Sequence, residues 1–168
     1  MKYKIASKKL SYLFLSFALI SSLISCEQVE SEPDDSDILI SEATGKWVVD
    51  IIHNGELTDS NTISTYNTGA NDSDMMWVDD LQHGFWLKAK VSLSLGDLTF
   101  GGSDLDELYD PGVTVTITEG KIVKDGATTP SGDTVDSIYF KAVFSNDDPN
   151  SVWEYSGYKS TAKINDLP

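Results

Sequence analysis

The strongest constraint on the fold is a two-residue alternation of apolar and polar side chains in several short segments. The clearest segment covers residues 85–95, in which every second residue is apolar. Successive side chains of a β-strand point to opposite faces, so this alternation predicts a strand with one apolar face. Segments 47–51, 113–118, 138–144 and 153–157 carry the same signal. The chain is therefore expected to be all-β, without a convincing helix.

Turn-forming residues separate these segments. Runs rich in Gly, Asn, Asp and Pro lie at 54–55, 69–74, 101–102, 111–112, 125–126, 131–133 and 147–150. Such residues favour tight turns because they tolerate or preset backbone angles that other residues avoid. Their spacing predicts about eight antiparallel strands, and these could either close into a barrel or pack as a sandwich.

The first 25 residues have the layout of a secretory signal. Four lysines precede an apolar run at 10–24, and this run is shorter than the roughly 20 apolar residues that a transmembrane helix needs. The run ends at Leu23-Ile24-Ser25-Cys26, which resembles the lipobox of bacterial lipoproteins. The resemblance implies that residues 1–25 are a lipoprotein signal peptide and that Cys26 is acylated and anchors the protein to a membrane.

The next segment, residues 26–42, is acidic and poor in apolar residues, which predicts a flexible tether. Residues 43–168 then form the β-barrel domain. Acidic residues directly after the lipidated cysteine resemble the surface-display signal of Bacteroidetes lipoproteins. We therefore expect the protein to be lipid-anchored at the outer membrane of the cell envelope. The sequence leaves open whether it lies on the periplasmic or on the external face.

The charge of the chain restricts its partners. The formal net charge is −15 and all cationic residues are lysines; removal of the leader takes four lysines with it, which changes the net charge to −19. A protein this acidic repels phosphate backbones, so a nucleic-acid partner is excluded.

The tripeptide Gly45-Lys46-Trp47 stands at the start of the first expected strand. A Gly-x-Trp at this place resembles the signature of lipocalins and the wider calycin group. The resemblance implies that Gly45 and Trp47 form the base of an eight-stranded barrel, with the indole against a basic residue late in the chain. Since arginine does not occur here, Lys159 or Lys163 would take that role.

The middle of the chain carries a more specific resemblance. Residues 66–80, which lead into 85–91, are similar to a Bacteroidetes family named lipid-binding putative hydrolases, small lipoproteins with a lipocalin-like barrel. The similarity extends from Gly45 to Gly157-Tyr158. It implies that the protein binds a lipid or another apolar small molecule in a β-barrel cavity.

The alternation in the strands suggests which residues would line such a cavity. If segment 85–95 turns its apolar face inward, its central side chains border the interior, and the small Ala89 leaves room for a ligand. The candidate ligand-binding residues are Trp77, Leu87, Ala89, Val91 and Phe140. The alternative, that these side chains simply fill the core, remains open.

Hydrolysis would need a nucleophile beside a base, most often a histidine. His83 follows Asp79 and Asp80 closely, so these three residues are the candidate catalytic group, whereas His53 is expected to be structural. The chain has no Gly-x-Ser-x-Gly elbow. We therefore expect binding without catalysis; a lipid or ester hydrolase and an accessory subunit of an outer-membrane assembly are the alternatives.

Metal binding has little support in the sequence. Zinc is disfavoured because the two histidines are far apart. Acidic loops at 71–80 and 104–110 could supply oxygen ligands for a structural calcium ion, but neither has the spacing of an EF-hand. No cofactor is expected, with calcium as the alternative.

Overall fold

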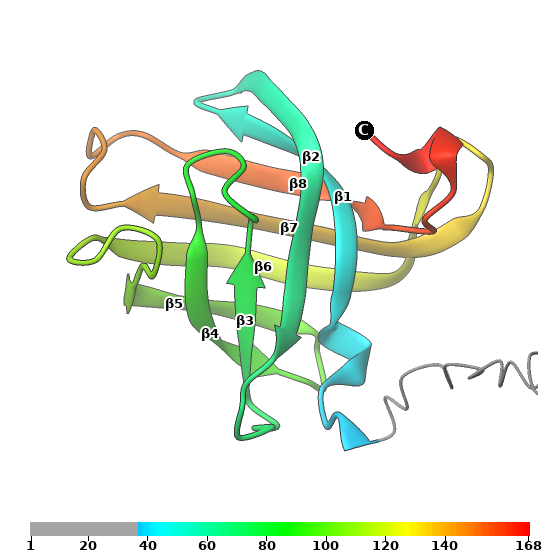
Figure 1. The fold of residues 1–168 in the computed structure, drawn as a ribbon, viewed down its shortest axis with the longest axis horizontal. Coiled ribbons are helices and arrows are strands. Elements are labelled where there is room, and N and C mark those ends of the chain that lie inside the picture. The colour runs from blue at the N-terminus through cyan, green and yellow to red at the C-terminus, as the bar shows by residue number, and fades with distance from the viewer. Residues whose placement is uncertain (1–36) are drawn as a thin grey trace, which may run out of the picture. The chain divides into compact units, whose positions relative to one another are not determined.

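A computed structural model describes residues 37–168, which form a closed barrel of eight antiparallel strands (Figure 1). The elements are η2 (Ser41–Ala43), β1 (Gly45–His53), β2 (Glu56–Asn67), β3 (Met75–Asp79), β4 (Lys88–Ser94), β5 (Thr99–Asp106), β6 (Thr114–Thr128), β7 (Thr134–Phe144), β8 (Trp153–Lys159) and η3 (Ile164–Asp166). The expected lipocalin-like all-β barrel of about eight strands is confirmed. The expected signal peptide, Cys26 and most of the tether lie outside the described residues. Within residues 37–168 no helix has the length and apolar character to cross a membrane.

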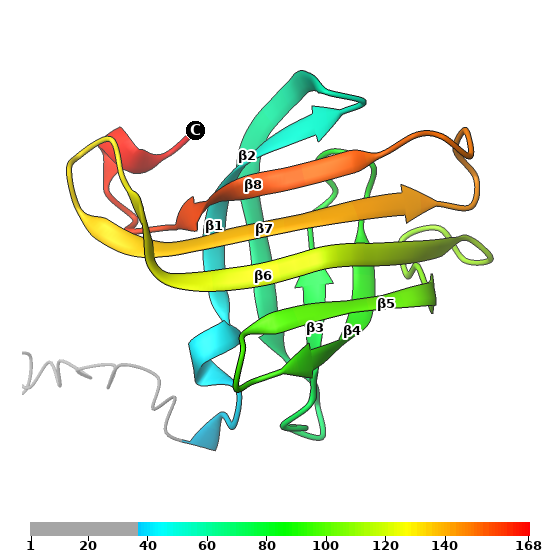
Figure 2. The ribbon, with the colours of Figure 1, turned by 180° about the vertical axis from the view of Figure 1, so that it is seen from behind.

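The barrel closes because β1 pairs with both β2 and β8. Its pairing with β8 runs from Trp47 opposite Lys159 to His53 opposite Trp153. Figure 2 shows β5 to β8 side by side, crossing the direction of β1 and β2 steeply. This closure excludes the open sandwich that the sequence left possible.

Trp47 seals one end of the barrel, which we call the base. Its side chain is fully buried, and its indole Nε1 donates a hydrogen bond to Thr65 Oγ1 at 2.9 Å. The ammonium of Lys159 lies 5.9 Å from the centroid of the Trp47 rings. Gly45 allows this approach, since a Cβ there would lie 2.9 Å from Lys159 Cε. Of the two lysines that the lipocalin resemblance offered, Lys159 thus lies against Trp47.

The segment before β1 belongs to the folded domain. Ile40 and Ala43 are fully buried in the core, and the carbonyl of Ala43 accepts a 2.7 Å hydrogen bond from Thr65 Oγ1. The ordered domain therefore begins before residue 43, where the sequence placed its boundary.

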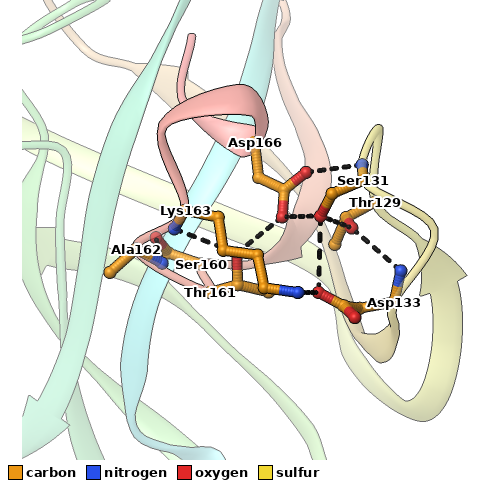
Figure 3. Close-up of polar contacts among 8 residues, drawn as sticks. All are labelled: Thr129, Ser131, Asp133, Ser160, Thr161, Ala162, Lys163 and Asp166. Carbon is orange, nitrogen blue, oxygen red and sulfur yellow. Dashed lines mark hydrogen bonds and ion pairs between the residues drawn. The ribbon is translucent and has the colours of Figure 1, made fainter.

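The C-terminal segment is tied to the β6–β7 turn by a polar cluster (Figure 3). The carboxylate of Asp166 accepts hydrogen bonds from the Ser131 amide at 2.7 Å and from the Ser131 and Thr161 hydroxyls at 2.6 Å each. Burial opposes ionisation, but these bonds outweigh it and lower the pKa of Asp166 to about 2. An ion pair between Lys163 and Asp133 adds a second link.

Candidate functional site at the barrel mouth

Three of the loops at the end of the barrel opposite Trp47, which we call the mouth, carry the candidate site. They connect β3 to β4, β5 to β6 and β7 to β8; because the strands alternate in direction, these loops share one end. Between them lies a pocket of about 310 Å³, the mouth pocket. It is lined by Gly84, Phe85, Trp86, Glu107, Asp110, Val113, Phe144 and Asn146.

The floor of the mouth pocket is aromatic. The ring of Phe85 lies 4.7 Å from that of Phe144 and 5.1 Å from that of Trp153, measured between centroids. Phe85 therefore plugs the mouth and separates the pocket from the core. Trp86, its neighbour, also lines the pocket and is 54% exposed.

The alternation of segment 85–95 predicted a strand from residue 85, but β4 begins only at Lys88. The preceding loop has positive φ angles at Leu81, Gln82, Gly84 and Trp86, which an extended strand does not allow. The apolar phase of the pattern still places Phe85 inward. The strand therefore begins later than predicted, but Phe85 faces the interior as predicted.

The opposite wall of the mouth pocket is acidic. Glu107 is only 3% exposed, and its carboxylate accepts hydrogen bonds from the amides of Lys88 at 2.8 Å, Tyr109 at 3.0 Å and Asp110 at 2.5 Å. These bonds hold the β5–β6 loop in place. The exposed Asp110 carboxylate accepts a 3.3 Å bond from Asn146 Nδ2, which links this loop to the β7–β8 loop.

Four of the five predicted ligand-binding residues point into the barrel but do not line a cavity there. Leu87, Ala89, Val91 and Phe140 have no accessible surface. A side chain beside a void that could hold water would retain such surface. Aromatic packing accounts for this, since Phe140 stacks on Tyr155 at 4.5 Å between centroids. The prediction that these residues border a cavity is wrong. The structure shows the alternative, in which their side chains fill the core.

Trp77, the fifth predicted residue, lies on the outer face. Its neighbours in β3, Met76 and Val78, are fully buried, whereas Trp77 is partly exposed and pairs with Lys90 and Tyr66 on adjacent strands. Because side chains alternate along a strand, Trp77 points away from the interior. The prediction that it lines the interior is wrong.

The predicted catalytic residues do not converge. Asp79 points outward and pairs with Lys88 at 2.9 Å; burial opposes ionisation, but hydrogen bonds from Tyr109 and Lys88 lower its pKa. Asp80 points inward, where burial raises its pKa to about 7 and the hydroxyl of Tyr155 donates a 3.2 Å hydrogen bond to it. No hydrogen bond in the described part of the chain joins the His83 side chain to either carboxylate. His83 therefore has no orienting carboxylate here.

A different histidine has polar partners at the mouth. His53 Nε2 lies 2.5 Å from Ser151 Oγ, and Ser151 in turn donates a 2.7 Å hydrogen bond to Asp147 Oδ2. Hydrogen bonds from Trp153 and Ser151 lower the pKa of Asp147, so its carboxylate is ionised and can only accept. Ser151 Oγ thus lies between a histidine nitrogen and a carboxylate. Ser151 is only 2% exposed, so this arrangement gives a substrate no access to its hydroxyl group.

Two of the potential calcium ligands have partners within the protein. Asn71 Oδ1 accepts a 3.2 Å hydrogen bond from the Leu39 amide, and Asp72 accepts a 2.7 Å bond from Thr68. Within residues 37–168 no group of three or more His, Cys, Asp or Glu side chains is placed to hold a metal ion.

The eight-stranded closed barrel, with Trp47 at its base and a pocket at its mouth, places the protein in the lipocalin-like class of all-β barrels. A family model described as lipid-binding putative hydrolase matches residues 32–163. The chain belongs to this family, whose description supports a lipid as the ligand. A comparison with curated proteins found no match.

Proposed function

We propose that the protein binds the hydrocarbon chain of a lipid in the mouth pocket. The observation that carries this proposal is the pocket itself, with a floor of Phe85 and Phe144 and a wall of Val113 and Trp86. Its volume of about 310 Å³ is at the lower end of the range for small-molecule sites. Each buried CH₂ group would contribute about 0.8 kcal/mol. The pocket is therefore suited to part of one chain rather than to a whole lipid.

This proposal moves the ligand site from the centre of the barrel to its mouth. The interior side chains Leu87, Ala89 and Val91 are packed without accessible surface, so a ligand there would have to displace them. The mouth pocket needs no such rearrangement. A longer chain could gain depth only where Phe85 moves away from Phe144.

Replacing Val113 with aspartate is expected to weaken binding of a neutral amphiphile, dodecyl maltoside, at least about tenfold, because a charge would then lie where the chain packs. Isothermal titration of the monomeric detergent measures the effect. Ile164→Asp is the matched control, since Ile164 is 85% exposed at the other end of the barrel. Equal affinity of both variants and the wild type would place the chain elsewhere.

We further propose that Cys26 is acylated and that the acidic residues after it tether the barrel to the outer membrane of the cell envelope. The lysine-rich start, the apolar run and the position of the single cysteine support this proposal. Cells that express Cys26→Ser and are fed a labelled fatty acid should show no label in the protein, whereas the wild type should be labelled. Label in the variant would contradict acylation at Cys26.

Hydrolysis does not form part of the proposal. Ser151 is only 2% exposed, and His83 is not joined to Asp79 or Asp80. Docking onto an outer-membrane assembly remains the alternative that a stable co-purifying partner would support.

A further inference from the structure

The charged side chains that line the mouth pocket are all acidic. Glu107 and Asp110 contribute carboxylates, and no lysine lines the pocket. The nearest basic side chain in sequence, Lys88, directs its ammonium to Asp79 at 2.9 Å, between the rings of Tyr66 and Tyr109. A ligand with a carboxylate or phosphate would therefore bring its charge next to carboxylates, with no cation among the lining residues to compensate it.

The two carboxylates differ in their availability. Glu107 is buried, and its carboxylate oxygens accept hydrogen bonds from three backbone amides. It therefore acts on a ligand mainly through its negative electrostatic potential. Asp110 is exposed, and its one side-chain bond in the described structure is a 3.3 Å contact with Asn146. Asp110 can therefore approach a cation directly.

Aromatic rings complete the site. Phe85, Trp86 and Phe144 line the same pocket, and Trp86 is just over half exposed. The face of an aromatic ring attracts a cation, and tryptophan does so most strongly. Aromatic faces together with a carboxylate are the groups that recognise an ammonium ion, including a quaternary one that can donate no hydrogen bond.

We infer that the mouth pocket selects an amphiphile with an ammonium head group, held between the face of Trp86 and the carboxylate of Asp110. This inference rests on the proposed function, since the hydrocarbon chain of the same molecule would occupy the aromatic floor. It adds the chemical class of the ligand. Fatty acids and anionic phospholipids are the classes that this pocket rejects.

Three probes with the same chain length test the inference: dodecyltrimethylammonium, dodecyl maltoside and dodecanoate, each titrated as monomer by calorimetry. The ammonium compound is expected to bind at least about tenfold more tightly than the maltoside, and dodecanoate most weakly. Asp110→Asn should reduce the preference for ammonium over maltoside about threefold or more. Trp86→Leu should reduce this preference likewise, because leucine keeps an apolar wall for the chain but has no aromatic face for the cation. The ratio of the two affinities is the readout, since a loss of chain contact weakens both probes alike.

Because the whole chain is acidic, it attracts any cation nonspecifically. The control variant must therefore remove one negative charge at a site away from the pocket. Asp97→Asn does this in the exposed β4–β5 turn at the base of the barrel. An equal loss of preference in Asp97→Asn and Asp110→Asn would overturn the inference. Equal affinities for the ammonium compound and the maltoside would also overturn the inference, but they would leave the proposed lipid binding intact. If none of the three probes binds, the proposed function itself fails.

Discussion

Replacing Gly157 with alanine is expected to remove more than about 4 kcal/mol of stability, a loss that few single substitutions cause. Gly157 lies in β8 directly opposite Val49 of β1, where the barrel closes. A Cβ at this position would clash with the carbonyl oxygen of Val48 and lie 2.7 Å from Val49 Cα. Both are backbone atoms, so the added methyl group can be accommodated only if β1 and β8 separate.

Urea unfolding followed by circular dichroism measures this loss. Gly96→Ala is the matched control, because a Cβ at Gly96 meets no atom within 4 Å and its φ is not in the left-handed region. The control is expected to stay within about 1 kcal/mol of the wild type. A similarly small change in Gly157→Ala would show that β1 and β8 do not approach as described.

Replacing Asp80 with asparagine is expected to stabilise the protein at about pH 8 by roughly 2–4 kcal/mol, since one pKa unit corresponds to about 1.4 kcal/mol. Asp80 is fully buried, and burial raises its pKa from 3.8 to about 7. Its contribution to stability is therefore complete below about pH 4 and is lost as the pH rises through about 7. Asparagine carries no charge to bury and can still accept the 3.0 Å bond from the Gln82 amide.

The test compares unfolding free energies of wild type and variant between about pH 4 and pH 8. Their difference should grow over this range and then level off. The groups near Asp80 include Asp79, which raises its pKa further, and Tyr155, whose hydroxyl bond lowers it. Asp74→Asn, at an exposed acid, controls for the loss of one negative charge. A pH-independent difference for Asp80→Asn would contradict the assignment.

The fold follows closely from the sequence because alternation and turn residues act locally. Trp47, Val49 and Ile51 alternate as predicted and all face the core. Alternation cannot, however, tell whether Phe85 and Trp86 continue a strand or lie in a loop. The difference comes from positive φ angles at Gly84 and Trp86, which the side-chain pattern does not record.

The site was harder to predict than the fold. Residues 75–78 are four apolar residues in a row, so nothing in the sequence shows that Trp77 faces outward. Whether Phe140 borders a cavity depends on its stacking with Tyr155 from the next strand, and therefore on volumes rather than on periodicity. His53 and Ser151 are 98 residues apart and meet only through the pairing of β1 with β8.

A lipid chain is expected to bind at the mouth of the barrel and not in its interior. The most direct test is an NMR titration of the protein with dodecyl maltoside, followed through methyl and indole signals. The signals of the Val113 methyl groups and the Trp86 indole are expected to shift with ligand concentration, whereas those of the buried Ala89 and Val91 methyl groups keep their positions. Shifts of Ala89 and Val91 with an unchanged Val113 would contradict binding at the mouth.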